Sequence, residues 1–400
     1  MENITDTKFH RGKEGYQKAY ADLMITAVDR ERITQKDRDY IKAFISEIRA
    51  YGKLSDQRSY KLAYQLVVLR EYLPEYTTVD NISVISGIEK IKTESGYTAI
   101  TQADYIKLAK RFLLWMAESG YASPSLNTEK LRKIKASIEM VTKTPDDILA
   151  PNEVEALFKA VTNTRDRAFL EILYESAARA GEIATITWGQ VTFYQNYASI
   201  TVSGKTGKIR VCPLYSSHVI LRRWKDQFSD PKPNDLIFRP NPDVNEPFTY
   251  NGMLYLVQKA SDRANISKNV TLHIFRHSRI THLLQAGLNE STIKLLAWGD
   301  ISTDMLKVYA HLVPGDVENA FSQLYGIKPI EQFKGIDPAI TPVQCPDCGM
   351  LNPNTNNFCS NCGVALSAYA TEEKKIAKAV YSEDDIKQMI NEAIESKLNI

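Results

Sequence analysis

The 400-residue chain lacks any long apolar segment, and this absence excludes several classes of protein. No run of about 18 apolar residues occurs, so the sequence predicts no transmembrane helix and no membrane partner. Residues 1–6 are polar and show no hydrophobic core of a secretory signal. We therefore expect an intracellular protein that resides in the cytoplasm.

The chain also lacks a strong excess of one charge, because its formal net charge is only +2. That value alone does not indicate a nucleic-acid partner. The distribution is uneven: residues 1–145 carry 24 Lys and Arg against 19 Asp and Glu, whereas residues 332–400 carry 6 against 9. A positive N-terminal part with an acidic tail fits a DNA clamp followed by a tail that does not bind DNA. The same distribution fits chance equally well.

Cysteine is scarce, and four of the five cysteines lie close together. Two Cys-x-x-Cys-Gly motifs, ten residues apart, contain Cys345, Cys348, Cys359 and Cys362. In a reducing cytosol such a cluster indicates a metal rather than disulfides. The spacing predicts one structural zinc ion held by four thiolates, with a redox pair or an iron–sulfur site as alternatives. Cys212 stands alone, and we expect it to be a buried core residue.

The N-terminal third carries helical patterns, and the total length indicates two or three domains. Thr34 and Ser55 are candidate helix N-caps, and leucines at helical spacing follow between residues 60 and 73. Further helices are expected near residues 80–94 and 101–119. We predict a helical domain at residues 31–122, preceded by a partly ordered N-terminal extension at residues 1–30.

The remainder of the chain reads as a second helical domain, a cysteine-rich ribbon and a tail. Residues 191–211 are rich in β-branched and aromatic residues, which predicts a small antiparallel sheet. Helices are expected near residues 152–162, 164–179, 215–228, 249–264, 273–287, 289–297, 302–310 and 314–325. The predicted boundaries are a linker at 123–148, a domain at 149–326, a linker at 327–344, the ribbon at 345–366 and a tail at 367–400 with an amphipathic helix at 383–398. The predicted fold class is mainly α.

The sequence has no glycine-rich phosphate-binding loop and no metal-ligand cluster next to the candidate catalytic residues. Arg179, His273, Arg276 and Tyr309 form a set suited to attack on a phosphodiester. Arginine presents two donors at once to phosphate oxygens, and tyrosine can carry a phosphoryl group covalently. The arginines would then supply most of the charge stabilisation. His273 could donate a hydrogen bond to a phosphate oxygen or exchange a proton with the nucleophile. Lys205, in a β-turn, could reach a leaving 5′-oxygen as a general acid.

Taken singly, these residues have ordinary explanations. An arginine such as Arg179 is often part of a surface salt bridge, and a histidine such as His273 is often a core or capping residue. Tyr309 is one of 21 tyrosines. The order and spacing of the residues together therefore carry the hypothesis.

At this point the chain resembles a known family, the tyrosine recombinases or phage integrases, over roughly residues 30–326. Six segments resemble family motifs in the expected order: 149–154, 177–188, 202–214, 272–278, 295–300 and 308–312. The resemblance implies a helical (SAM-like) core-binding domain that closes around DNA and an α-rich catalytic domain. It implies a catalytic set of Arg179, Lys205, His273, Arg276, Trp298 and Tyr309.

The match departs from the family pattern at a few positions. Trp298 stands where many members have histidine, and the resemblance implies that its indole N–H binds the phosphate. The segment from Trp298 to Tyr309 is slightly longer than is typical. Asp300 is a less suitable candidate because a carboxylate repels phosphate. Lys205 is favoured as the catalytic lysine, with Lys208 as the alternative, and Glu182 takes the place of the acid that supports Arg179.

The activity implied by the resemblance is site-specific DNA recombination and integration. Tyr309 would attack a strand of double-stranded DNA to leave a 3′-phosphotyrosyl link and a free 5′-hydroxyl, without nucleotide cofactor or catalytic metal. Family members act as homo-tetramers on paired specific sites.

The cysteine segment resembles zinc ribbons appended to many archaeal proteins. The alternatives are an inactive integrase-like DNA-binding protein and a type IB topoisomerase-like relaxing enzyme. The tail favours mobile-element integration over chromosome dimer resolution, and the target sequence stays open.

Overall fold

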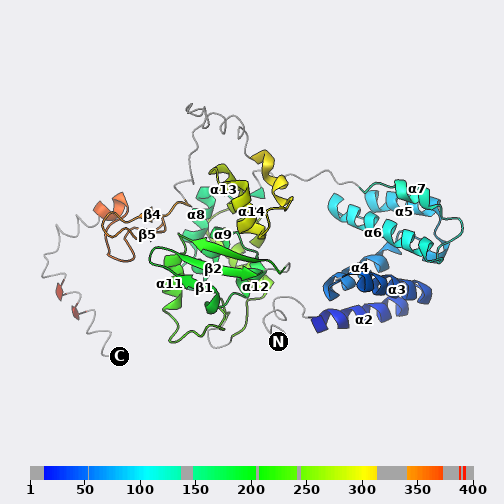
Figure 1. Cartoon of the computed structure of the whole chain (residues 1–400), viewed down its shortest axis with the longest axis horizontal. Coiled ribbons are helices and arrows are strands. Elements are labelled where there is room, and N and C mark those ends of the chain that lie inside the picture. The colour runs from blue at the N-terminus through cyan, green and yellow to red at the C-terminus, as the bar shows by residue number, and fades with distance from the viewer. Residues whose placement is uncertain are drawn as a thin grey trace. The chain divides into compact units, whose positions relative to one another are not determined.

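The structure is a computed structural model that describes residues 13–52, 54–136, 147–203, 207–240, 245–312, 340–372, 387–388 and 391–392. The chain forms two compact units, Met1–Val141 and Thr142–Ile400. Both are mainly helical, and the second contains a small antiparallel sheet (Figure 1), which confirms the predicted fold class. The helix predicted at 314–325 lies outside the described residues. So does the helix predicted at 383–398, apart from residues 387–388 and 391–392, which are helical.

The N-terminal unit consists of helices, several of which begin after an N-cap residue that can be recognised in the sequence. Its elements are α2 (Lys13–Asp29), α3 (Gln35–Tyr51), α4 (Asp56–Leu69), the 3₁₀ turn η1 (Tyr76–Thr78), α5 (Asn81–Thr93), α6 (Ala99–Glu118) and α7 (Thr128–Lys133). The side chains of Thr34, Ser55, Asp80 and Thr98 each accept a hydrogen bond from a backbone N–H in the first turn of the following helix. Each cap satisfies a donor that the helix itself leaves unpaired.

Helix α2 forms part of the predicted N-terminal extension, for which the sequence analysis predicts no helix. Residues 13–29 are helical, and Met24 and Ala27 are buried in the core of the unit. The sequence of α2 has only a weak apolar stripe, so its local pattern gives little signal. The helix is stabilised by packing against α4, which is a tertiary effect.

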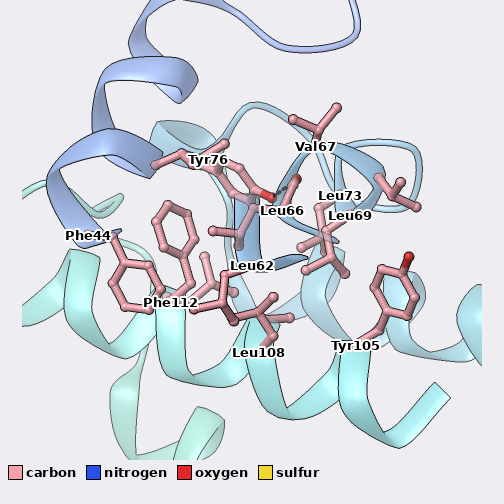
Figure 2. Packing of buried hydrophobic residues seen from close by; sticks show 14 of the residues in the cluster. Phe44, Leu62, Leu66, Val67, Leu69, Leu73, Tyr76, Tyr105, Leu108 and Phe112 are labelled. Carbon is pink, nitrogen blue, oxygen red and sulfur yellow. Dashed lines mark hydrogen bonds between the residues drawn. The ribbon is translucent and has the colours of Figure 1, made fainter. Parts of the chain in front are cut away.

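Helix α4 lies at the centre of this core, and Figure 2 shows the side chains that surround it. Phe112 packs against Phe44 and Tyr76, with ring centroids 5.1 and 4.8 Å apart. The buried hydroxyl of Tyr76 donates a hydrogen bond of 2.6 Å to the carbonyl of Leu66. The aromatic rings therefore fill the core without leaving the Tyr76 hydroxyl unpaired.

The carboxylate of Asp37 is fully buried and joins three segments of the unit. It accepts hydrogen bonds from the backbone N–H of Thr34 (3.1 Å) and of Tyr76 (3.0 Å). Arg70 donates a further hydrogen bond at 2.7 Å. A buried charge is tolerated only when it is paired and hydrogen-bonded, and Asp37 meets both conditions.

We expect Asp37→Ala to lower the free energy of unfolding of the N-terminal unit by roughly 3 to 5 kcal/mol, because it leaves Arg70 and two backbone donors without their acceptor. Native-state hydrogen exchange at the α4 amides measures this loss. Asp39→Ala is the matched control, since Asp39 is 62% exposed in its pair with Arg38 and should change stability by at most about 1 kcal/mol. Equal protection of α4 in the two variants would contradict the assignment.

The second unit surrounds its sheet with helices (Figure 1). Strand β2 (Ala198–Ser203) pairs antiparallel with β1 (Val191–Phe193) and β3 (Ile209–Leu214). Its helical elements are α8 (Pro151–Ala160), α9 (Thr164–Glu175), α10 (Ala180–Ala184), η3 (Trp188–Gln190), α11 (His218–Lys225), α12 (Tyr250–Arg263), α13 (Leu272–Gln285), α14 (Glu290–Trp298) and η4 (Met305–Leu312). Cys212 is fully buried in β3, as predicted. No helix in the described ranges is long and apolar enough to cross a membrane.

Two predicted helices differ from the structure. The helix expected at 164–179 ends at Glu175, because the Ser176 hydroxyl donates to the carbonyl of Ile172 and accepts from the N–H of Ala178. Ala177 then adopts a left-handed φ of 50°, and α10 begins after Arg179. The helix expected at 302–310 is the 3₁₀ helix η4. Both differences lie beside the site described below.

Candidate active site

Arg276 lies in α13 and is almost fully buried, with 4% of its surface exposed. Its guanidinium donates hydrogen bonds to the carbonyls of Ala177 and Ala297. Burial, reinforced by the nearby Arg179 and Arg210, lowers the pKa of Arg276 to about 10. The side chain is thus a fixed cation that ties the corner after α9 to the end of α14.

Arg179 stands at the N-terminus of α10, directly after the corner at Ala177. Its backbone N–H and one guanidinium nitrogen donate to the two carboxylate oxygens of Glu182, at 2.8 and 3.0 Å. The Arg179 side chain is 36% exposed while that of Glu182 is 5% exposed. Glu182 therefore holds Arg179 in place and leaves part of the guanidinium accessible, in the supporting position that the sequence predicted.

Arg210, in β3, is part of the site that sequence reasoning missed. It is buried, donates to the carboxylate of Glu182, and binds the carbonyls of Leu296 (2.8 Å) and Ala297. Strand β3 alternates exposed and buried positions, which turns Arg210 inward together with Cys212. A charged residue at an inward position of an alternating strand needs a buried partner, and this is the signal that could have identified it.

Trp298 and Tyr309 lie close to Arg276. The Arg276 guanidinium sits over the ring of Trp298, 5.0 Å from the centroid, at the end of α14. Tyr309, in η4, is 3% exposed and belongs to the same buried cluster as Ala177 and Ala297, whose carbonyls Arg276 binds. Burial raises the pKa of Tyr309 to about 12, and Arg276 opposes the shift. The phenol is therefore neutral at physiological pH.

The two histidines of α13 occupy different positions. His273 is exposed, whereas His277 is half-buried and its Nδ1 forms a hydrogen bond with the Tyr309 hydroxyl. The two imidazole rings lie edge to face, with centroids 5.5 Å apart. The spacing of four residues places both on one face of the helix. That spacing was the available signal for His277, which the sequence analysis did not include in the site.

Of the two candidate lysines between β2 and β3, the structure describes only Lys208. Lys205 lies outside the described residues. Lys208 forms an ion pair with Asp300, just after α14. This hydrogen bond and those from Ser302 hold the pKa of Asp300 far below its usual range. Lys208 thus anchors the hairpin to the end of α14.

The structure therefore brings Arg179, Arg276, Trp298 and Tyr309 into one region, with His273 at its exposed edge. These residues come from elements that are separate in the sequence, namely the start of α10, helix α13, the end of α14 and η4. A partly exposed arginine beside a buried arginine can neutralise a phosphate, and a neighbouring tyrosine can act as nucleophile.

We expect Arg210→Ala to loosen this region, because it removes the buried donor that joins Glu182 to the carbonyls of Leu296 and Ala297. The destabilisation should be roughly 3 to 5 kcal/mol, seen as faster hydrogen exchange at the last amides of α14. Lys208→Ala, which removes a pair with side chains 45% and 29% exposed, serves as the comparison and should cost at most about 1 kcal/mol. Unchanged exchange in Arg210→Ala would show that the α14 end does not depend on this contact.

The four clustered cysteines converge on one point. Their sulfur atoms all lie within 4.8 Å of one another, and the Cys345–Cys362 and Cys348–Cys359 pairs are 3.5 and 3.6 Å apart. The motifs repeat one turn, in which the N–H of Gly349 or Gly363 donates to the carbonyl of the first cysteine. Both glycines adopt left-handed φ angles of 71° and 72°. Four converging thiols fit a tetrahedral metal ion.

The segment that carries these cysteines, which includes β4 (Val343–Gln344) and β5 (Leu351–Asn352), contacts the helical part of the second unit. Arg167 of α9 donates to the hydroxyl of Thr355 at 2.5 Å, and Arg223 of α11 donates to that of Ser360 at 3.4 Å. Pro353 and Thr355 face Glu171 and Tyr174 of α9 across a small cavity. Polar contacts thus hold the segment against the outside of α9 and α11.

Comparisons with known proteins find relatives of one family and solved structures with a similar fold. Residues 147–314 match the model of the phage integrase family. Tyrosine recombinase XerC of Lacticaseibacillus casei is 24% identical over 298 residues, which cover 65% of this chain and 95% of the relative. Tyrosine recombinase XerD of Staphylococcus haemolyticus is 26% identical over 278 residues, covering 66% and 88%.

Solved structures share the fold. The XerH site-specific recombinase bound to palindromic difH substrate, a post-cleavage complex, has a TM-score of 0.52 at 14% identity and covers 79% of this chain and 99% of that one. Lambda integrase (residues 75–356) bound to DNA has a TM-score of 0.52 at 13% identity, covering 68% and 95%. Residues 147–314 thus form a phage integrase domain, and the tyrosine recombinases among the relatives confirm the family resemblance found in the sequence.

Proposed function

We propose that this protein is a site-specific DNA recombinase that cleaves and rejoins DNA strands through a 3′-phosphotyrosyl intermediate. The observation that carries the proposal is the position of Tyr309. It lies within the electrostatic reach of Arg276 and in the same buried cluster as Ala177 and Ala297, whose carbonyls Arg276 binds. The nucleophile and the cation come from different elements, and the fold of the unit brings them together.

The chemistry follows from the charge of the substrate. A DNA phosphodiester is already negative, so its non-bridging oxygens must be neutralised as a nucleophile approaches. We assign this role to Arg179 and Arg276, with the indole N–H of Trp298 as a further donor and His273 at the exposed edge as a donor to phosphate. Tyr309 attacks phosphorus and the 5′-oxygen leaves. The link conserves the bond energy, so reversal by a partner strand requires no nucleotide cofactor.

We assign protonation of the leaving 5′-oxygen to Lys205. We prefer Lys205 to Lys208 because Lys208 forms an ion pair with Asp300. If Lys208 left that pair, the carboxylate of Asp300 would remain unpaired beside the end of α14. Lys205 precedes Lys208 in the same hairpin. A lysine on a flexible stem can approach an oxygen that moves as the bond breaks.

The proposed partners are double-stranded DNA with specific recombination sites and further copies of the chain. Lambda integrase has been solved as a tetramer bound to a Holliday junction, and we propose a homo-tetramer on paired sites here. We further propose a cytoplasmic integrase of the archaeal type that serves a mobile element, because its chain extends beyond the recombinase portion into a cysteine-rich segment.

The proposal predicts a covalent protein–DNA adduct that depends on Tyr309. Cells expressing the protein are lysed in denaturant, the attached DNA is sequenced, and the recovered sequence is used as a nicked duplex in vitro. Wild type should form an adduct on a denaturing gel and Tyr309→Phe should form none, because the attacking oxygen is absent. Tyr255→Phe, at a tyrosine 64% exposed on α12, is the matched control and should react normally.

Other results would point elsewhere. An adduct that persists in Tyr309→Phe would refute the nucleophile assignment. DNA binding without any adduct would indicate an inactive integrase-like binding protein. Relaxation of a supercoiled plasmid that lacks the recovered site would indicate a type IB topoisomerase-like enzyme.

We also propose that the four cysteines hold one structural zinc ion. The proposal rests on the convergence of the sulfur atoms and on the repeated glycine turn, which match a closed four-thiolate site. The ion would order a short segment that has few apolar residues of its own, and it would take no part in strand cleavage.

Metal analysis of the purified protein should therefore find about one zinc per chain. Cys348→Ser should lower the zinc content and increase proteolysis within residues 340–372, because a structural zinc site contributes directly to folding. Cys212→Ala, which removes a cysteine outside the cluster, should retain the zinc. A folded segment without metal, or an iron–sulfur absorbance spectrum, would refute the zinc assignment.

A further inference from the structure

We propose that His277 is the residue that accepts the proton of Tyr309 during strand cleavage and returns it during rejoining. This inference rests on the proposed function and assigns one step of it. The hydrogen bond between His277 Nδ1 and the Tyr309 hydroxyl carries it. The two rings are tilted by 42°, with centroids 5.7 Å apart, so the contact runs through the polar atoms and not through ring stacking.

Helix α13 explains why His277 reaches this position. Successive residues of an α-helix point about 100° apart. Arg276 points into the unit, where it binds the carbonyls of Ala177 and Ala297. His277, the next residue, is half-buried and contacts Tyr309 of η4 through its hydrogen bond. The same helix therefore presents a fixed cation and a titratable base to the region around Tyr309.

Tyr309 needs such an acceptor because it is buried and holds its proton strongly. Burial raises the pKa of Tyr309 to about 12, even though Arg276 opposes the shift. Arg276 cannot take the proton, since arginine remains protonated and two of its nitrogens already donate to carbonyls. A neutral imidazole with a proton on Nε2 presents Nδ1 as an acceptor, and histidine exchanges protons near neutral pH.

As the bond from Tyr309 Oη to phosphorus forms, the phenolic proton moves to His277 Nδ1 and the bond from phosphorus to the 5′-oxygen breaks. The leaving oxygen takes a proton from a separate acid, assigned above to Lys205. In rejoining, the 5′-hydroxyl attacks phosphorus, and the His277 imidazolium returns its proton to the departing Tyr309 oxygen. No redox partner is needed.

The assignment separates the two histidines of α13. His273 is exposed at the edge of the site, with its ring 5.5 Å from that of His277. We leave His273 the role of a donor to phosphate oxygen. Among the described residues, the titratable groups that contact His277 include His273 from α13 and Tyr309 from η4. Arg276 precedes His277 in α13, and Arg179 at the start of α10 acts on Arg276.

The test is the pH dependence of single-turnover cleavage, with the nicked duplex obtained by denaturing capture. In wild type the rate should rise with pH and level off above about pH 6 to 7, where a histidine becomes neutral. His277→Asn keeps an amide oxygen near the position of Nδ1 but cannot take up a proton. It should cleave about 10²- to 10³-fold more slowly and lose the inflection, with DNA affinity and melting temperature close to wild type.

His277→Gln and His273→Gln complete the series. His277→Gln should behave like His277→Asn, which guards against a folding defect peculiar to one variant. His273→Gln should be slower than wild type but keep the pH inflection, because His277 is still present.

The failures are distinguishable. If wild type forms no Tyr309-dependent adduct, the proposed function is wrong and this assignment falls with it. If wild type cleaves and His277→Asn cleaves equally fast with the same pH profile, only the His277 assignment is wrong. Faster cleavage by His277→Asn would also overturn it, since the hydrogen bond would then restrain the nucleophile. Loss of the inflection in His273→Gln alone would transfer the role to His273.

Discussion

The buried guanidinium of Arg276 is the interaction on which the rest of the site depends. Removing such a charge from water costs several kcal/mol unless good acceptors surround it. The carbonyls of Ala177 and Ala297 supply them, and they belong to the corner after α9 and to the last turn of α14. Both backbone segments must therefore stay in contact with α13. Arg179 follows one of these carbonyls, Trp298 follows the other, and Tyr309 belongs to the same buried cluster as Ala177 and Ala297.

A second buried charge extends this arrangement to the sheet. Arg210 joins Glu182, which holds Arg179, to the end of α14. Three arginines thus lie around a single carboxylate, and their mutual repulsion contributes to the lowered pKa of Arg276. An anion such as a phosphate would relieve that repulsion. The excess of positive charge around Glu182 favours the substrate that we propose.

The sequence predicted local structure well where a single residue decides it. Thr34 and Ser55 begin helices because a hydroxyl at the N-cap pairs with a backbone donor. Each Cys-x-x-Cys-Gly motif forms its own turn because the hydrogen bond from the glycine to the first cysteine is local. Prediction failed where packing decides. Helix α2 has a weak apolar stripe and depends on α4, and α9 ends at Glu175 because Ser176 binds backbone groups that would otherwise continue the helix.

The sequence alone determined the chemical groups, their order and their family, because these reside in short motifs with fixed spacing. Only the tertiary structure decided which groups meet. In the structure, His277 and not His273 forms the hydrogen bond to Tyr309, the side chain of Arg210 points inward, and Lys208 forms an ion pair with Asp300. The physical reason is that these contacts join residues 28 to 92 positions apart. Their partners depend on helix rotation and strand register, where a shift of one residue exchanges one side chain for another.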